Sequence, residues 1–417
     1  MKSRQPAKTK SQAKARGTRP TCLFLSTYFP PMIGGSIVYY RYLLSKCTAD
    51  DVVVLSLAHE GSAAFDASAP YRIIRSRLLP CFGIQSRLRK LVGALAMFPI
   101  LLFWVLRYRA PVLHLGNFSP DILAGWPIAR LMGRRLVVTI LGEELTTVGG
   151  LWSVFRPLRV LGDWAAYWML RHCAVVQTIS GFTRSELLRR GIREDRIAVI
   201  TPGIDLDKSR CDRPIAAEIA ARLAGKRIVL TVGRFTARKG QDMTIRALPR
   251  VLSSHPDVVY VMAGSACYEN CQECARLIEE RNLQGSAVLL KDLDSDSIAW
   301  LYQNCEVFIM ANRTLANNDT EGYGIVFLEA GAWGKPVVGG RAGGATDAVD
   351  DGVTGILVDG TSEESIADAL NRLLSDKELA RRMGEAGRRK VAQNSWDAKC
   401  DQYLGLIGAL AHPEKTR

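Results

Sequence analysis

The stretch Thr201-Pro-Gly-Ile-Asp205 divides the sequence into two halves that share one internal rhythm. In each half, short apolar runs alternate with segments of helical periodicity, and the alternation starts again directly after this stretch. Pro202 and Gly203 fit neither pattern, because proline lacks the N–H donor of a regular element and glycine favours turns. We therefore predict a boundary between two domains here, at residues 201 and 202.

Both halves contain strands rich in Val, Ile and Leu, with helices such as 36–46, 121–132 and 182–190 between them. The predicted strands are Cys22–Thr27, Val52–Leu57, Tyr71–Arg75, Pro111–Leu115, Leu136–Leu141, Val175–Ile179 and Ile197–Thr201, then Ile228–Val232, Val258–Ala263, Ala287–Leu290, Val307–Met310 and Pro336–Val338. Apolar strands separated by helices are typical of parallel sheets covered on both faces. We expect an α/β protein of two doubly wound, Rossmann-like domains, with the ligand crevice between them at the carboxyl ends of the strands.

The length of 417 residues agrees with this organisation, since domains commonly contain about 100–200 residues. We predict a disordered basic tail over residues 1–20, a first domain over 21–201, a second over 202–394, and a last helix within 395–417 that could pack on either domain. With 48% apolar residues, the chain can bury a core without disulfides. Ten scattered cysteines and no visible secretory signal favour reduced thiols in the cytoplasm.

Positive charge is concentrated in the first half of the chain. Residues 1–200 hold 28 Lys and Arg against 11 Asp and Glu, a net +17, whereas residues 201–417 hold 27 against 30, a net −3. Such a surface suits acidic lipid headgroups or nucleic acid, and equally an ordinary solvated face. The cations are not interleaved with aromatic residues as in a recognisable nucleic-acid module, so we predict no nucleic-acid partner.

One segment of the first half has the composition of a helix at a membrane surface. Residues 91–106 carry no charge, and cations flank them at 87–90 and 107–109. The run is shorter than the about 20 residues of a spanning helix and is interrupted by Pro99. A helix on an anionic membrane and a buried core helix both explain it. The first interpretation predicts an anionic membrane surface as a partner, with the protein peripheral on the cytoplasmic, inner face of the cell membrane.

The stretch Glu321-Gly-Tyr-Gly-Ile-Val-Phe-Leu-Glu329 combines two carboxylates with a glycine turn. Gly322 and Gly324 let the backbone approach a ligand closely, and the helix that follows presents free N–H groups to an anion. Glu321 on the loop could accept hydrogen bonds from sugar hydroxyls, and Glu329 on the helix could hold a ribose diol. A loop before an amphipathic helix explains the same residues without a function.

The stretch Val232-Gly-Arg-Phe-Thr-Ala-Arg-Lys239 follows a predicted strand and precedes a predicted helix. We expect Arg234 to point into the crevice and Lys239 to lie at the helix start. Two cations directed at one point can neutralise a pyrophosphate leaving group without a metal. A basic surface turn is the alternative interpretation.

A third stretch, Phe29-Pro-Pro-Met-Ile-Gly-Gly35, lies between the first predicted strand and the first helix. The paired glycines Gly34 and Gly35 allow a ligand to approach the backbone at the N-terminus of that helix. A structural tight turn explains them equally well.

These stretches, in this order, resemble glycosyltransferase family 4. The matching positions are Glu321 and Glu329 for its E-x7-E motif, Arg234 and Lys239 for its phosphate-binding pair, Gly34 and Gly35 for its glycine loop, Thr201–Asp205 for its interdomain connector, and Gly343–Val349 with Asp351–Gly355 for a further family stretch. The resemblance covers about residues 21–405, and five ordered motifs are far more specific than one.

The family implies a GT-B fold and a retaining sugar transfer from a nucleoside-diphosphate donor, with no cofactor and no essential metal. It implies that Glu321, Arg234 and Lys239 form the catalytic set. The implied donor-binding residues are Gly34, Gly35, Glu321, Gly322, Tyr323, Gly324, Ile325, Val326 and Glu329. The reaction would be a front-face displacement through an oxocarbenium-like state, in which the leaving phosphate oxygen assists proton transfer from the acceptor.

The glutamate and arginine stretches look closest to the phosphatidylinositol mannosyltransferase branch, whose members are peripheral membrane enzymes. This resemblance implies transfer of a hexose, and it favours GDP-mannose over a UDP-hexose as the donor. It also implies a lipid-linked or glycan acceptor in polysaccharide or glycolipid biosynthesis. One position departs from the family, in which a histidine before a glycine often holds the donor sugar. Here Leu141 precedes Gly142, and Glu143 or Glu144 could substitute.

Other chemistries fit the sequence less well. Residues 292–296 imitate the D-x-D metal motif of single-domain transferases, but this chain has two domains. Cys267, Cys271 and Cys274 lack the fourth ligand of a closed zinc site, so we predict no metal. No Walker or dinucleotide glycine motif is present. An inactive GT-B scaffold that binds lipid or a partner enzyme, and a GT-B phosphorylase, are the alternative functions.

Overall fold

The structure is a computed structural model of the chain. It describes residues 19–32, 34–79, 87–118, 121–142, 156–205, 211, 213–265 and 270–413, with the backbone alone for 87–95 and 156–161. Most of the predicted tail lies outside these residues, as do Glu143 and Glu144, the suggested substitutes for the family histidine.

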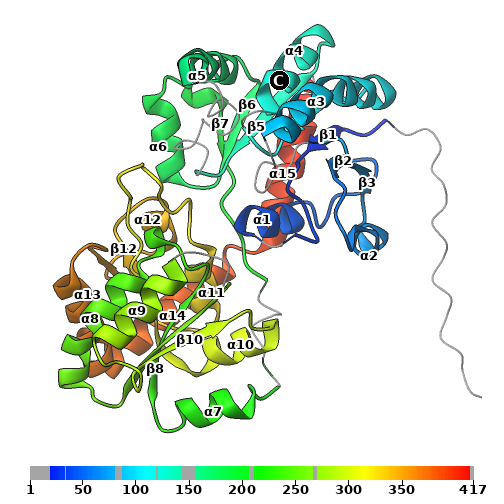
Figure 1. The fold of residues 1–417 in the computed structure, drawn as a ribbon. Helices are drawn as coiled ribbons and strands as arrows, with labels where there is room; N and C mark the ends of the chain where they lie inside the picture. Colours follow the sequence, from blue (N-terminus) through cyan, green and yellow to red (C-terminus); the bar gives the residue numbers. More distant parts are fainter. Residues whose placement is uncertain are drawn as a thin grey trace, which may run out of the picture.

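Two parallel sheets form the framework of the chain (Figure 1). The first has the order β3-β2-β1-β4-β5-β6-β7 and consists of β1 (Cys22–Leu25), β2 (Val52–Leu57), β3 (Arg72–Ser76), β4 (Val112–Leu115), β5 (Arg135–Ile140), β6 (Val175–Thr178) and β7 (Ile197–Val199). The second has the order β10-β9-β8-β11-β12-β13 and consists of β8 (Arg227–Val232), β9 (Val258–Gly264), β10 (Ala287–Lys291), β11 (Cys305–Met310), β12 (Val337–Gly340) and β13 (Gly355–Val358). Each predicted strand is confirmed to within two residues at its ends, whereas β13 was missed, because its four residues begin with a glycine and directly follow a turn.

Helices connect these strands and confirm the predicted α/β class. They are α1 (Gly35–Leu43), α2 (Ser62–Ser68), α3 (Arg87–Tyr108), α4 (Asp121–Leu131), α5 (Arg156–Arg171), α6 (Gly181–Arg189), α7 (Ala217–Leu223), α8 (Gln241–Ser254), α9 (Asn270–Glu280), α10 (Ser295–Asn304), α11 (Ile325–Ala332), α12 (Ala345–Ala348), α13 (Glu363–Ser375), α14 (Lys377–Ala392) and α15 (Trp396–Ala411).

The apolar segment that we compared with a membrane helix is one continuous helix, α3, which contains Pro99 without ending there. Met97, Leu101 and Val105 of α3 are buried in the core of the first sheet, and this packing compensates for the backbone hydrogen bond that proline removes. Within the described parts of the chain, no helix has both the length and the apolar character needed to span a bilayer.

Alternate residues of β1 enter two different cores. Leu23 and Leu25 pack with residues of α3, α4 and α5, whereas Cys22 and Phe24 pack on the opposite face, where α1 and α15 lie. This period of two is the geometry of a strand covered on both sides. The same division holds in the second sheet, where α8, α9 and α13 cover one face and α10 and α11 the other.

The last helix, α15, packs on the first sheet beside α1 (Figure 1). The ring of Trp396 stacks on that of Tyr42 with 5.2 Å between the centroids. The hydroxyl of Tyr403 lies 2.8 Å from Nδ1 of His114, and burial lowers the pKa of this histidine to about 3. His114 is therefore neutral and serves the packing of α15.

The exact limits of the two domains stay a prediction.

Two of the three cysteines that we considered as zinc ligands are core residues. Cys271 and Cys274 are buried in α9, and Cys267 lies outside the described residues. Burial raises the pKa of the Cys274 thiol to about 12. A protonated thiol in an apolar core is a poor metal ligand, because metals bind the thiolate.

Candidate functional site

Three neighbouring strands of the second sheet end at one place. β8, β11 and β12 lie side by side, and the strand order reverses between β8 and β11. A ligand crevice is expected at such a reversal, outside the carboxyl ends of the strands. The segments that follow these strands carry Lys239, Glu321 and Gly343, so the sheet brings together residues that are far apart in the sequence.

Glu321 lies buried between two cations. Its Oε2 atom accepts a hydrogen bond from Nζ of Lys239 at 3.0 Å and another from the guanidinium of Arg238. Burial alone would raise the pKa of Glu321, but the charges of Lys239 and Arg238 outweigh it and hold the pKa at about 2. The carboxylate is therefore ionised at neutral pH. Both contacts use Oε2, so Oε1 can accept a hydrogen bond from a hydroxyl group.

Arg234 and Lys239, the predicted pair of cations, share their turn with a third cation, Arg238, whose part in the site the sequence did not reveal. Burial lowers the pKa of Lys239, and the charges of Arg238 and Arg234 lower it further, whereas Glu321 opposes the change. Arg234 is half-buried, and its carbonyl accepts a hydrogen bond from the side chain of Gln241 at 3.1 Å. The charge of Arg234 therefore acts on the Lys239 side chain.

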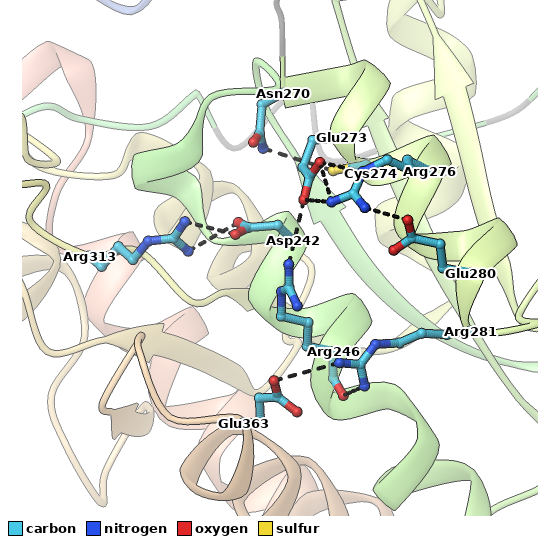
Figure 2. A network of polar contacts seen from close by, with 10 residues as sticks. All are labelled: Asp242, Arg246, Asn270, Glu273, Cys274, Arg276, Glu280, Arg281, Arg313 and Glu363. Atoms are coloured by element: carbon cyan, nitrogen blue, oxygen red, sulfur yellow. Dashed lines mark hydrogen bonds and ion pairs between the residues drawn. The ribbon is translucent and has the colours of Figure 1, made fainter.

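The turn that bears these cations is fixed by the loop after β11. Gly240 has a φ of 75°, and a Cβ there would lie 1.9 Å from the carbonyl oxygen of Ala311. The N–H of Arg313 donates to the carbonyl of Arg238 at 2.8 Å. The Arg313 guanidinium also binds both carboxylate oxygens of Asp242, at 3.0 and 2.8 Å (Figure 2). Lys239 thus lies just before α8, close to its predicted place at the helix start.

A second glycine loop supports the loop that carries Glu321. The N–H of Gly344 donates to the carbonyl of Glu321 at 2.7 Å. A Cβ on Gly343 would lie 2.3 Å from the same carbonyl oxygen, and one on Gly344 would lie 2.0 Å from that of Gly322. Glycines at these positions are therefore required for the two loops to pack. From the sequence, this stretch was matched to the family without a role of its own.

The first domain touches the same loop. A Cβ on Gly322 would lie 2.2 Å from the carbonyl oxygen of Leu141, and one on Gly142 would lie 3.1 Å from the Cα of Gly322. The Leu141 side chain is buried and offers no hydrogen bond, as predicted from its type. In addition, the carboxylate of Asp347 accepts a hydrogen bond from the N–H of Phe182 at 3.0 Å, at the start of α6. These contacts join the site loops of the second domain to the first domain.

The start of α11 presents its backbone to this region. Gly324 caps the helix with a φ of 89°, and Ile325 and Val326 form its first turn, whose N–H groups have no partner within the helix. The Tyr323 ring is buried with 4% of its surface exposed, and burial raises the pKa of its hydroxyl. The backbone at 323–326 can therefore contact a ligand, whereas the Tyr323 ring belongs to the core.

Glu329 lies on α11 and is oriented by α10. Its carboxylate accepts a hydrogen bond from the hydroxyl of Tyr302 at 2.7 Å. Burial raises the pKa of Glu329, which the Tyr302 hydrogen bond partly offsets. Tyr302 could not be found from the sequence, because no local pattern links α10 to α11.

The glycine loop of the first domain has space beside it. α1 begins at Gly35 with Gly34 as its cap. A Cβ on Gly35 would meet no heavy atom within 4 Å, and one on Gly34 would lie 3.5 Å from the Ile37 side chain. Packing within the protein therefore does not require glycine at either position, which leaves room for close approach of a ligand.

Comparison with known proteins identifies the family. The description Glycosyltransferase Family 4 matches residues 33–208, and Glycosyl transferases group 1 matches residues 212–390. The GDP-mannose-dependent alpha-(1-6)-phosphatidylinositol monomannoside mannosyltransferase of Mycolicibacterium smegmatis is 31% identical over 401 residues, which cover 92% of this chain and 97% of the relative. The chain belongs to glycosyltransferase family 4.

A second relative and a solved structure agree with this assignment. A GDP-mannose-dependent monoacylated alpha-(1-6)-phosphatidylinositol monomannoside mannosyltransferase of Corynebacterium glutamicum is 26% identical, covering 92% of this chain and 97% of the relative. The Anabaena HepE protein, solved in complex with UDP and glucose, superposes with a TM-score of 0.74 at 19% identity, covering 93% and 99% of the two chains. The predicted GT-B fold is confirmed.

In this family 4 glycosyltransferase, charged side chains form the centre of the candidate site. Glu321, Lys239 and Arg238 form a buried cluster, and Arg234 lies at its edge. Within the described ranges, no three His, Cys, Asp or Glu side chains gather as a metal site would require. The position of Arg238 beside Lys239 was a sign that it could belong to the site. The sequence does not show, however, which of these cations is buried.

Proposed function

We propose that this glycosyltransferase moves mannose from GDP-mannose to a lipid-linked or glycan acceptor in glycolipid or polysaccharide synthesis, with retention of anomeric configuration and without a metal. The observation that carries the proposal is the ionised Glu321, held by Lys239 and Arg238 beside Arg234. The names of the two relatives support GDP-mannose as donor and a glycolipid as acceptor.

In the proposed mechanism, Arg234 and Lys239 bind the diphosphate of the donor and stabilise the charge that develops on it. The bond between the anomeric carbon and the phosphate oxygen breaks, and the acceptor oxygen forms its bond from the same face. The acceptor proton passes to the leaving phosphate oxygen, so no enzyme nucleophile is required. The backbone N–H groups of Ile325 and Val326 complete the anion site at the start of α11.

The two glutamates would bind the sugar portions of the donor. Glu321 can accept a hydrogen bond from a sugar hydroxyl through Oε1, because Lys239 and Arg238 both contact Oε2. Glu329 would bind the ribose, held in place by the Tyr302 hydroxyl. Gly34 and Gly35 would let the donor approach the N-terminus of α1.

We also propose that the enzyme works as a peripheral protein on the cytoplasmic face of the membrane. The first half of the chain carries the net positive charge. On α3, Phe98, Phe103 and Leu106 expose 38%, 58% and 52% of their surface. Exposed apolar side chains beside cations are typical of proteins that bind anionic membranes.

A thermal-shift experiment tests the donor site. GDP should raise the melting temperature more than UDP, ADP or NADH, and both Arg234→Ala and Lys239→Ala should remove the shift. Transfer from GDP-mannose to a lipid extract, with the product examined by NMR, tests the anomeric outcome, and the same reaction with EDTA tests metal independence. If no nucleoside diphosphate stabilises the protein, the proposed donor site is wrong.

The position of Leu141 favours one alternative, an inactive scaffold that binds a lipid or a partner enzyme. Its apolar side chain cannot replace the hydrogen bonds of the family histidine. A protein that binds GDP normally but transfers no sugar to any fraction of the lipid extract would support the scaffold. Phosphate-dependent release of a sugar phosphate would instead indicate a GT-B phosphorylase.

A further inference from the structure

The strand order of the first sheet reverses between β1 and β4, which are neighbours in the sheet. A ligand crevice is expected at such a reversal, outside the carboxyl ends of the two strands. Thr27 follows β1 and Asn117 follows β4, so both residues lie at this reversal. The proposed donor residues lie on the second domain and at Gly34 and Gly35, which leaves Thr27 and Asn117 without an assigned ligand.

This reversal lies beside the proposed site of the donor sugar. β4 pairs with β5, and neighbouring strands are about 4.8 Å apart. Leu141 follows β5, and a Cβ on Gly322 would lie 2.2 Å from its carbonyl oxygen. Gly322 is the neighbour in sequence of Glu321, which we propose binds the donor sugar. A ligand group held at Asn117 would therefore lie about one strand away from the reacting sugar, where the acceptor has to be.

The side-chain amide of Asn117 is oriented by two buried oxygen atoms. Its Nδ2 atom donates to Oγ1 of Thr27 at 3.4 Å and to Oδ2 of Asp121 at 3.5 Å. The amide oxygen Oδ1 takes part in neither contact. Within the described parts of the chain, Oδ1 has no hydrogen-bond partner, and it is not one of the buried polar atoms. This oxygen is therefore available to accept a hydrogen bond from a hydroxyl group of a ligand.

Asp121, the first residue of α4, is a buried carboxyl group whose contacts in the protein are few. None of its surface is exposed, and its Oδ1 atom has no hydrogen-bond partner among the residues that the structure describes. Burial raises the pKa of Asp121 to about 7, and no cation opposes this change. A buried carboxyl group without a cation lowers the stability of the fold. Residues that cost stability in this way are typical of functional sites.

We propose that Oδ1 of Asn117 accepts a hydrogen bond from a ring hydroxyl of the acceptor, and that Asp121 is the positioning residue that holds the Asn117 amide for this contact. The ligand class is a hexose or cyclitol ring, which offers several hydroxyl groups. The proposal rests on the proposed function, because the acceptor is defined by its place beside the donor sugar. It deepens that function by naming two residues of the acceptor side.

The test measures binding of methyl α-D-mannopyranoside to the full-length protein by titration NMR. The donor site is first filled with GDP-2-deoxy-2-fluoromannose, so that the glycoside cannot enter the donor sugar position. We expect saturable binding to the native protein. Asn117→Ala should weaken binding about tenfold, as expected for the loss of one hydrogen bond. Asn304→Ala is the matched control and should bind normally, because it removes an exposed asparagine at the end of α10.

Variants of Asp121 separate positioning from a purely structural role. Asp121→Leu should also weaken binding about tenfold without lowering the melting temperature, because it removes a buried carboxyl group. The double variant Asn117→Ala/Asp121→Leu should bind no more weakly than either single variant, since Asp121 acts through Asn117. Asp121→Asn keeps an oxygen that can accept from the Asn117 amide, so it should bind as the native protein does. This isosteric variant keeps the test decisive if Asp121→Leu does not fold.

Three results would overturn the proposal. The hydroxyl site is wrong if the native protein does not bind the glycoside or if Asn117→Ala binds it normally. The positioning role is wrong if Asp121→Leu binds normally, or if the losses of the two single variants multiply to about a hundredfold in the double variant. Binding of the donor analogue is measured on every variant by calorimetry and should be unchanged. Failure of the native protein to bind this analogue would instead overturn the proposed function, and the glycoside titration without the analogue would still test Asn117.

Discussion

Gly322 contacts Leu141 of the first domain so closely that residue 322 has no room for a Cβ atom. We therefore predict that the two domains close on the proposed donor site only if residue 322 is glycine. A Cβ at residue 322 would lie 2.2 Å from the carbonyl oxygen of Leu141. Carbon contacts are most favourable at about 3.5 Å, so the variant Gly322→Ala has to separate these backbones by about 1 Å. The overlap lies between domains, and a small rotation of one domain relieves it.

We expect Gly322→Ala to lower kcat/KM about a hundredfold, because a displacement of about 1 Å in a catalytic arrangement costs this much. The loss corresponds to about 2.7 kcal/mol of transition-state stabilisation. The melting temperature should change little, since each domain keeps its own core. GDP affinity should also be retained, because Arg234 and Lys239 lie on the second domain with Gly322.

The assay is the initial rate of GDP release from GDP-mannose with the lipid acceptor found in the transfer experiment. Gly285→Ala is the control, because a Cβ there meets no atom within 4 Å. A native kcat/KM in Gly322→Ala, with a native melting temperature, would refute the reasoning. The apposition of Gly322 and Leu141 would then not belong to the active arrangement.

Three further variants test separate parts of the structure. Tyr302→Phe removes the hydroxyl that orients Glu329. It should raise the KM for the donor about tenfold with little change in kcat, because this contact would stabilise the ground state and the transition state equally. Steady-state kinetics measure KM and kcat. Asp121→Asn should raise the melting temperature, and more at pH 8 than at pH 5. Because the folded pKa of Asp121 is raised to about 7 from 3.8, the folded state binds this proton more tightly, and stability falls as pH rises through that window, by at most about 4 kcal/mol. Asp347→Ala removes the acceptor for the Phe182 N–H and should lower kcat/KM about tenfold while GDP binding, measured by calorimetry, is unchanged.

Most of the fold could be predicted from the sequence because each buried strand is a short Val, Ile and Leu run bounded by polar or turn residues. β13 is the exception, since Gly355–Val358 gives too short a run to separate from the preceding turn. The helix through Pro99 was predicted from its composition, but the sequence left open whether it is a core helix or a surface helix. Its continuity depends on the burial of Met97, Leu101 and Val105 against the sheet, and such tertiary packing cannot be read from a local pattern.

The residues of the candidate site could be predicted where a single loop contains the charged side chains. The sequence did not show which of these side chains are buried, because tertiary packing determines that. The sequence offered Arg234, Arg238 and Lys239 within one turn, and spacing cannot show which of them points inward. In the structure, Gly240 brings this turn against the loop after β11, and this buries Arg238 with Lys239 beside Glu321. Lys239 therefore contacts the carboxylate of Glu321, which we propose binds the donor sugar, while the charge of Arg234 also acts on it. If it also binds the diphosphate, as we propose, one ammonium group couples the position of the sugar to the charge of the leaving group.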